Sequence, residues 1–299
     1  MFGPYHGRQG NKQRIMIPTS RKPDWLKVKA FGSSRYRRVN HLLADYGLET
    51  VCHAANCPNR GECFDRGTAT FLVLGPTCTR NCRFCNISTG RPAPVQPDEP
   101  ARVAAMARRL RLRHVVVTSV TRDDLPDGGA AHFAETVRQI RLQLPPATVE
   151  LLTPDFRSAP GAPDSIIEAG PDVFNHNIET VPRLYPSVRP GADYRRSLQL
   201  LSYIREHSGI ITKSGLMVGL GEKTEELIRV FDDLATAGVS ILTIGQYLSP
   251  SKDHHGVIRY LPPAEFEYLG RQAQEAGIKR VMSAPLVRSS YRAEMFHQA

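Results

Sequence analysis

All six cysteines of this 299-residue chain lie within one short stretch, from Cys52 to Cys85. They form two sets of three, which are Cys52, Cys57 and Cys63 and then Cys78, Cys82 and Cys85. A disulfide framework spreads its cysteines over a secreted domain, whereas clustered cysteines are typical of metal ligation in a reducing compartment. The clustering therefore predicts metal sites and a cytoplasmic location.

The second set has the spacing Cys78-x3-Cys82-x2-Cys85 and follows an apolar, β-rich segment at residues 69–74. Three thiolates on one short loop can bind three corners of a cubane iron–sulfur cluster, which leaves the fourth iron open to a small molecule. A zinc site usually takes four protein ligands in paired spacings, so three cysteines fit it poorly. The spacing therefore favours a 4Fe-4S cluster with one open iron.

The first set, Cys52-x4-Cys57-x5-Cys63, predicts a second cubane just before the main domain begins. The residues alone leave its role open between a structural cluster, an electron relay and a source of inorganic sulfide. They also leave open two proteins of another class, a non-catalytic iron–sulfur electron carrier and a zinc-binding interaction protein.

Apolar segments alternate with helical stretches from residue 69 onward. Strands are expected at 69–74, 115–119, 149–152, 172–178, 213–218 and 241–246, and helices at about 98–112, 130–142, 165–169, 193–206, 224–237 and 263–276. Six consecutive βα units predict a parallel sheet with right-handed crossovers. Because a full TIM barrel has eight units, we expect an α/β fold with a partial (β/α)6 TIM-type barrel, and an open doubly wound sheet is the alternative.

The barrel is expected over residues 65–277, with an N-terminal extension at 1–64 and a C-terminal extension at 278–299. In either architecture the active site lies at the C-terminal ends of the strands. Asn175, Asn177 and Glu179 alternate at the end of the fourth strand, so we expect them on one face and His176 on the other. The acidic run at 123–127 follows the second strand, where a ligand amine could bind.

The net charge of +10 is concentrated in residues 1–40, which carry ten Lys or Arg and one Asp. This basic arm is either a solvated tail or a surface that meets an acidic partner. No nucleic-acid-binding module is recognisable, so no nucleic acid partner is expected. No run of 18 apolar residues occurs, so no membrane partner is expected either.

The spacing of the second set, with Phe84 before its third cysteine, is the signature of the radical S-adenosylmethionine superfamily, which the chain resembles. From about Arg21 to Phe296 the chain also resembles the lipoyl synthase family. The segments that carry this resemblance include CHAANCPNRGEC (52–63), CTRNCRFCNISTGRP (78–92), TSVTRDDLPDGGA (118–130), FNHNIETVPRLYPSVRPGADY (174–194), KSGLMVGLGE (213–222) and LVRSSY (286–291). A biotin-synthase-like sulfur insertion is the nearest alternative with the same chemistry.

The resemblance implies a sulfurtransferase that inserts two sulfur atoms at carbons 6 and 8 of a protein-bound octanoyl chain. It implies two 4Fe-4S clusters and S-adenosylmethionine as cofactors. It also implies an octanoylated carrier, either a dehydrogenase-complex lipoyl domain or a glycine-cleavage H protein, and a ferredoxin- or flavodoxin-type reductant. A 5′-deoxyadenosyl radical would abstract each hydrogen, and the auxiliary cluster would donate the sulfur.

The resemblance also implies site residues. The radical-generating cluster belongs to Cys78, Cys82 and Cys85, and the auxiliary cluster belongs to Cys52, Cys57, Cys63 and a serine of the RSSY motif. We expect Ser290 to be that ligand, with Ser289 as the weaker choice. Cofactor contacts are expected from Phe84, Ser119, Asn177 and Glu179, and no catalytic residue is expected beyond the clusters.

Overall fold

The computed structural model describes residues 22–27, 32–66 and 68–297. Residues 1–21, which carry four of the basic arm's ten Lys and Arg residues, lie outside the described residues, so the interpretation of that arm stays a prediction. Among the helices that the structure describes, none is long and apolar enough to cross a membrane.

A sheet in the order β1-β2-β5-β6-β7-β8-β9-β10 forms the centre of the described chain. Its strands are β1 (Glu49–Thr50), β2 (Thr70–Val73), β5 (His114–Ser119), β6 (Thr148–Leu152), β7 (Val173–Asn175), β8 (Ile211–Val218), β9 (Ile241–Gln246) and β10 (Arg280–Ser283). All neighbouring strands are parallel except β1, which pairs antiparallel with β2. Two very short strands, β3 (Thr77–Cys78) and β4 (Ser88–Thr89), pair beside this sheet.

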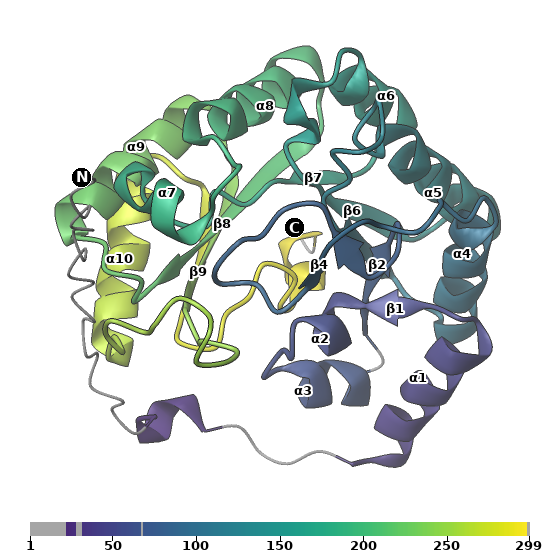
Figure 1. The fold of residues 1–299 in the computed structure, drawn as a ribbon, viewed down its shortest axis with the longest axis horizontal. Coiled ribbons are helices and arrows are strands. Elements are labelled where there is room, and N and C mark those ends of the chain that lie inside the picture. Colours follow the sequence, from purple (N-terminus) through teal and green to yellow (C-terminus); the bar gives the residue numbers. More distant parts are fainter. Residues whose placement is uncertain (1–21, 28–31, 67, 298–299) are drawn as a thin grey trace, which may run out of the picture.

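Helices connect the parallel strands in sequence order. The α-helices are α1 (Ser34–Asp45), α2 (Val51–Ala54), α3 (Arg60–Asp65), α4 (Glu99–Leu110), α5 (Ala130–Gln143), α6 (Ala162–Ala169), α7 (Tyr185–Val188), α8 (Tyr194–His207), α9 (Thr224–Thr236) and α10 (Pro263–Glu275). The 3-10 helices are Asp24–Leu26, Phe156–Ser158, Pro182–Leu184 and Ala293–His297. Figure 1 shows the sheet curving around a central space, with α4, α5, α6, α8, α9 and α10 on its outside.

Local signals in the sequence determine where several of these helices begin and end. The Ser33 hydroxyl accepts a hydrogen bond from the backbone N–H of Tyr36 at the start of α1, and Asp193 does the same for Arg196 at the start of α8. Gly170 ends α6 with φ 64°, a left-handed conformation that glycine adopts without a Cβ penalty. These caps fix the lengths of the crossovers and so the positions of the strand ends.

The prediction of six βα units in a partial barrel is confirmed, and the six expected helices lie within a few residues of their predicted bounds. The sheet is longer than predicted, because β1 extends it at one edge and β10 at the other. Within the described chain no ladder joins these two edges, so the barrel is open. The division at residues 64 and 277 stays a prediction, although β10 in the expected C-terminal extension belongs to the same sheet.

The outer face of the sheet carries the apolar core, and the inner face carries polar groups. Val149, Leu151 and Phe174 are fully buried in the hydrophobic core. The alternate residues Glu150 and Asn175 contact each other by a side-chain hydrogen bond on the inner face. The fold therefore surrounds a polar interior that opens at the C-terminal ends of the strands.

Candidate functional site

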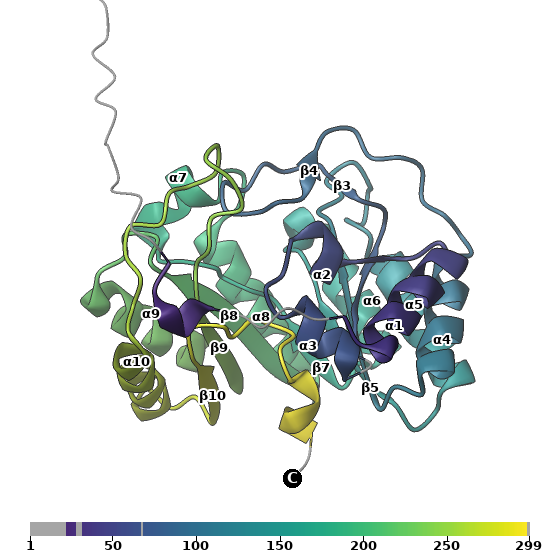
Figure 2. The ribbon, with the colours of Figure 1, turned by 90° about the horizontal axis from the view of Figure 1, so that it is seen from below.

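The second cysteine set lies on the loop that follows β2. Cys78 is in β3, and its Sγ accepts hydrogen bonds from the backbone N–H groups of Arg80 at 3.4 Å and Thr121 at 3.3 Å. Figure 2 shows the β3–β4 loop beyond one end of the sheet, on the side opposite the C-terminus. The cysteines are thus at the C-terminal ends of the strands, where the sequence places the active site.

Burial and neighbouring charges raise the pKa of two thiols in this set. Burial raises the pKa of Cys82 to about 11, and the neighbouring Cys78 thiol and Glu179 carboxylate also raise it, while the Arg189 guanidinium lowers it. Burial likewise raises the pKa of Cys85 to about 12, with further contributions from Cys82, Cys78 and Glu179. The thiols of Cys82 and Cys85 are therefore within electrostatic range of Glu179 and of the other cysteines of their set.

The first cysteine set is brought together by two short helices. Cys52 lies in α2 and Cys63 in α3, and Cys57 is in the turn between them, where its N–H donates to Cys52 O at 3.1 Å. Burial and the Cys57 thiol raise the pKa of Cys52 to about 11. Burial and both other thiols raise the pKa of Cys63 to about 12. This set is therefore a second group of three converging thiols.

The radical-site loop is anchored to elements far away in the sequence. The Arg83 N–H donates to Val188 O at 2.8 Å, and the His255 N–H donates to Arg83 O at 2.8 Å. The His254 ring contacts Cys85 O at 3.1 Å through Nε2. The loop after β9 thus holds the cysteine loop in place.

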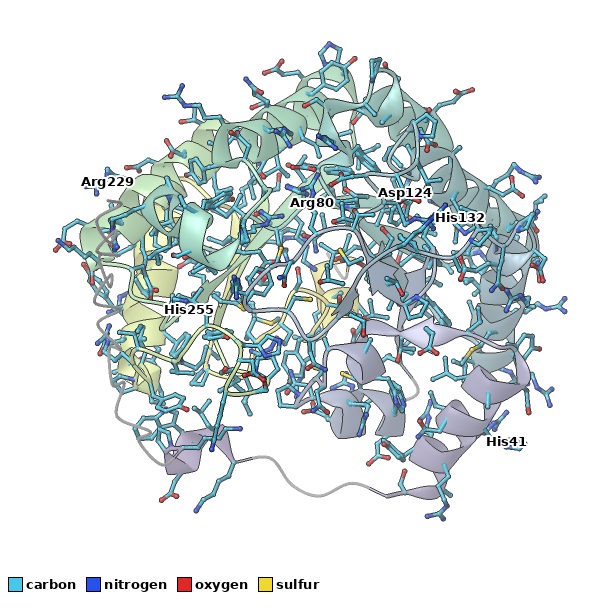
Figure 3. The ribbon with its side chains drawn as sticks, in the orientation of Figure 1. His41, Arg80, Asp124, His132, Arg229 and His255 are labelled. Carbon is cyan, nitrogen blue, oxygen red and sulfur yellow. The ribbon has the colours of Figure 1, made fainter. Side chains whose placement is uncertain are left out.

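Arg80, two residues after Cys78, lies at the centre of the molecule, whereas Arg229 lies at its rim (Figure 3). Its guanidinium pairs with Asp123 at 2.7 Å and with Asp155 at 2.7 Å. Asp124 pairs with Arg122 at 2.8 Å. The acidic run predicted to receive a ligand amine is therefore engaged in internal ion pairs.

The C-terminal segment enters the site between the two cysteine sets. Ser289 Oγ donates to Asn177 Oδ1 at 2.7 Å and accepts from Asn175 Nδ2 at 3.0 Å. At the other side of the segment the Glu62 carboxylate, next to Cys63, accepts from the Tyr291 hydroxyl at 3.1 Å. Figure 1 shows this segment beside α2 and α3, inside the opening of the sheet.

Glu179 and Arg189 form the polar mouth of the barrel. Glu179 has φ 67°, an uncommon backbone conformation for a residue with a side chain, and it accepts from Asn177 Nδ2 at 3.1 Å. Burial raises the pKa of Glu179, against the lowering effects of Arg189, Asn177 and Arg288. Arg189 donates to Asn177 O at 3.0 Å. Strained, buried polar residues of this kind cluster at functional sites.

Comparison with known proteins shows the family to which the chain belongs. Residues 72–234 match the model of the Radical SAM superfamily. The chain is 53% identical to the lipoyl synthase of Methylococcus capsulatus over 97% of this chain and 93% of that protein. It is 55% identical to the lipoyl synthase of Caldanaerobacter subterraneus subsp. tengcongensis over 93% of this chain and 97% of that protein. The chain belongs to the lipoyl synthase family.

Solved structures share the fold of this lipoyl synthase family member at low sequence identity. SuiB of Streptococcus suis bound to S-adenosylmethionine matches with a TM-score of 0.55 and 10% identity, over 76% of this chain and 55% of that one. HydG, a maturase of the [FeFe]-hydrogenase, matches with a TM-score of 0.55 and 13% identity, over 71% of this chain and 55% of that one. The chain thus spans little more than half of either protein, and the likeness supports the partial barrel alone.

The family implies S-adenosylmethionine and a 4Fe-4S cluster, and the donor sets fit cubane clusters better than single ions. Within the described chain no three His, Cys, Asp or Glu side chains are close enough to hold one metal ion. In a cubane each thiolate binds a separate iron, so its cysteines stand further apart than the ligands of one zinc ion. Burial and neighbouring thiols raise the pKa of Cys52, Cys63, Cys82 and Cys85, and a bound cluster would offset this effect by holding these groups as thiolates.

The other predicted site residues differ in their location and in the contacts that they make. Phe84 is half-buried in the cysteine loop and packs against the core. Ser119 ends β5 and donates to Val120 O at 2.7 Å. Ser290 Oγ makes no hydrogen bond to any residue that the structure describes, whereas Ser289 makes two. His176 faces outward to Thr153 O and Ser197, as strand alternation predicts.

Sequence reasoning missed several residues of this lipoyl synthase site. Arg189 lies in an irregular stretch after α7, and no motif in the sequence singled it out. Glu150 and Lys213 lie within strands that read as apolar, yet their side chains pair at 2.9 Å inside the barrel. A charged residue at an inward position of a strand was the one available signal for this pair.

Proposed function

We propose that this chain is a lipoyl synthase that inserts two sulfur atoms, at carbons 6 and 8, into an octanoyl chain attached to a lysine of a carrier protein. The observation that carries the proposal is the convergence of two separate three-cysteine groups on one polar centre. Glu179 is close to Cys82 and Cys85, and Arg288 is close to both Glu179 and Cys57. One site generating a radical and one site donating sulfur need this proximity.

Cys78, Cys82 and Cys85 would hold the cluster that binds S-adenosylmethionine. The chemistry supplied at this site would be one-electron cleavage of S-adenosylmethionine to a radical able to break an unactivated C–H bond, with the electron coming from an external reductant. The protein contributes position and exclusion of water. Phe84, Ser119, Asn177 and Glu179 are proposed cofactor contacts, and the half-buried Arg189 would balance the charge of the ligand carboxylate.

Cys52, Cys57, Cys63 and Ser290 would hold the auxiliary cluster, which supplies inorganic sulfide. Ser290 is favoured over Ser289, because the Ser289 hydroxyl is already committed to Asn175 and Asn177. A hard serine oxygen is a poor match for a cluster otherwise bound by soft thiolates. Such a ligand is easily released, as a cluster consumed during the reaction requires.

The substrate is proposed to be an octanoylated lipoyl domain of a dehydrogenase complex or an octanoylated glycine-cleavage H protein. A ferredoxin- or flavodoxin-type protein would supply the electrons. Six free cysteines in cluster-binding groups require a reducing compartment, so we propose that the protein works in the cytoplasm.

Mass spectrometry of an octanoylated lipoyl-domain peptide tests the proposal. After incubation with the reduced protein and S-adenosylmethionine, the peptide should gain two sulfur atoms. Cys57→Ala should still form 5′-deoxyadenosine but insert no sulfur, and Cys82→Ala should do neither. Formation of 5′-deoxyadenosine by the unaltered protein without any sulfur gain would overturn the sulfur-insertion function and leave the superfamily chemistry.

A further inference from the structure

A buried ion pair lies in the interior of the barrel. Lys213 of β8 and Glu150 of β6 are 0% and 1% exposed. Lys213 Nζ lies 2.9 Å from Glu150 Oε1 and 3.0 Å from Oε2. Replacing a buried ion pair by apolar residues of similar volume is often neutral or stabilising. Stability alone therefore does not explain why this pair occupies the interior.

The Glu150 carboxylate also holds the side chain of Asn175. Asn175 Nδ2 donates to Glu150 Oε1 at 2.8 Å and, with its second hydrogen, to Ser289 Oγ at 3.0 Å. Burial opposes ionisation of Glu150, but Lys213 and His114 outweigh it and lower its pKa to about 2. An ionised carboxylate only accepts hydrogen bonds, so it forces the Nδ2 end of the Asn175 amide to face it.

This orientation determines the direction of the next hydrogen bond. Because Asn175 donates to Ser289 Oγ, the Ser289 hydroxyl is free to donate its own proton to Asn177 Oδ1 at 2.7 Å. The charge on Glu150 thus sets the polarity of a chain of hydrogen bonds that runs from the barrel interior to the C-terminal segment. Among the described residues Asn175 Oδ1 has no hydrogen-bond partner, whereas its Nδ2 group makes two hydrogen bonds, so the chain of hydrogen bonds depends on the Nδ2 end of the amide.

Ser289 and Ser290 are the two central residues of a tight turn. The Tyr291 N–H donates to Arg288 O at 2.9 Å across that turn. A side chain fixed at one central position of a turn also fixes the position of the next residue. Holding Ser289 in the barrel therefore holds in a defined place the hydroxyl of Ser290, which makes no hydrogen bond within the described part of the chain.

We propose that Asn175 is a positioning residue, oriented by the buried Glu150–Lys213 pair, which fixes Ser289 and so presents Ser290 to the auxiliary cluster. This inference rests on the proposed function, in which Ser290 is the fourth ligand. It gives the two serines of the RSSY motif separate tasks: Ser289 is the anchor and Ser290 is the ligand.

Iron release from the auxiliary site tests the proposal directly. Full-length protein carrying Cys78→Ala, Cys82→Ala and Cys85→Ala is reconstituted with iron and sulfide, so that all cluster iron belongs to the auxiliary site. Iron loss to a colorimetric chelator is then followed. Because residues that support metal ligands typically change affinity 10–100-fold, Asn175→Ala and Ser289→Ala should release iron at least about tenfold faster. Ser289→Thr, which keeps the hydroxyl, should release iron at the original rate.

Thr212→Val is the matched control. Thr212 is 0% exposed on the neighbouring strand and donates to Gly238 O at 2.7 Å, away from the barrel interior. The substitution Thr212→Val removes a buried hydroxyl and should leave the rate of iron release unchanged. Equal release rates in Asn175→Ala and Thr212→Val would overturn the positioning role.

A second variant separates positioning from stability. Glu150→Met combined with Lys213→Met replaces the pair by apolar side chains and leaves Asn175 without its acceptor. We expect the melting temperature of the iron-free protein to stay within a few degrees of the original, while iron release accelerates. Unchanged release, or loss of folding in this variant, would overturn the role given to Glu150.

Ser290→Ala distinguishes this inference from the proposed function. Fast iron release in Ser290→Ala with normal release in Asn175→Ala would refute the positioning role alone. Normal release in Ser290→Ala would refute serine ligation itself. In unaltered cysteine background, Asn175→Ala should still form 5′-deoxyadenosine from S-adenosylmethionine.

Discussion

Substitution of Gly245 by alanine should disable sulfur insertion without touching a proposed ligand. Gly245 lies in β9, where the C-terminal segment crosses the inner face of the sheet. A Cβ built on Gly245 would lie 2.1 Å from Val287 O and 3.1 Å from Val287 C. Ordinary contacts of a Cβ begin at 3.4 Å, so the Val287 backbone must move by about 1 Å or more in a close-packed interior.

The displaced residue is two positions from Ser289 and three from Ser290, so the shift carries the turn away from Asn175 and Asn177. Misplacement of about 1 Å at a reacting centre can cost roughly 100-fold in rate. Overpacking costs about 1–3 kcal/mol of stability. For a chain of this size, that corresponds to a melting temperature lowered by roughly 2–5 °C.

Two product assays on the same reaction mixture measure the effect. We expect Gly245→Ala to form 5′-deoxyadenosine at a near-normal rate and to insert sulfur roughly 100-fold more slowly. Gly209→Ala is the control, because nothing lies within 4 Å of the added Cβ. Normal sulfur insertion by a folded Gly245→Ala protein would refute the reasoning that the position of the C-terminal segment against β9 controls the auxiliary site.

Three further substitutions have defined outcomes. Gly215→Ala places a Cβ 2.7 Å from Asn177 Oδ1, so it should raise the KM for S-adenosylmethionine, and an unchanged KM would contradict the contact proposed for Asn177. Glu62→Gln weakens a half-exposed ion pair with Arg292 at 3.0 Å, so the free energy of unfolding measured in urea should fall by less than about 1 kcal/mol. A decrease of more than twice that value would contradict the view that solvent screens this pair. Burial lowers the pKa of His176 to about 4, so the unfolded chain binds this proton first and stability falls as pH drops below 6.5. Between pH 7 and 5 this histidine contributes on the order of 2 kcal/mol of that loss. The free energy of unfolding of His176→Gln, measured in urea at each pH, should therefore fall less steeply as the pH drops from 7 to 5.

Much of the fold was predictable because its signals are local. The apolar runs that became β2, β5, β6, β8 and β9 each lie between a helix end and a turn, and a parallel sheet follows from their alternation. The edge strands β1 and β10 were missed for a physical reason. β1 has two residues and β10 is half-buried throughout, so neither has an apolar run that pattern analysis can detect.

The cysteines were predictable as site residues because thiolate spacing on one loop is itself a local signal. Arg189, Glu150 and Lys213 were not, because their importance depends on which strands become neighbours. Lys213 reaches Glu150 across β7, a relation that no sequence spacing contains. The resemblance already favoured Ser290 over Ser289 as the ligand, and the structure adds that the Ser289 hydroxyl is hydrogen-bonded to Asn175 and Asn177.

The energetics of the C-terminal segment agree with the role proposed for it. Neutral hydrogen bonds such as those of Ser289 contribute about 1 kcal/mol each, and the half-exposed Glu62–Arg292 pair contributes less than that. Together these contacts stabilise the position of the turn by only a few kcal/mol. That is enough to define the position of Ser290, and small enough for the turn to detach from the barrel. A cluster that gives up its sulfide has to lose its protein ligands in turn. In the proposed auxiliary site, a serine held by these contacts would leave first, while Cys52, Cys57 and Cys63 would keep the remaining iron.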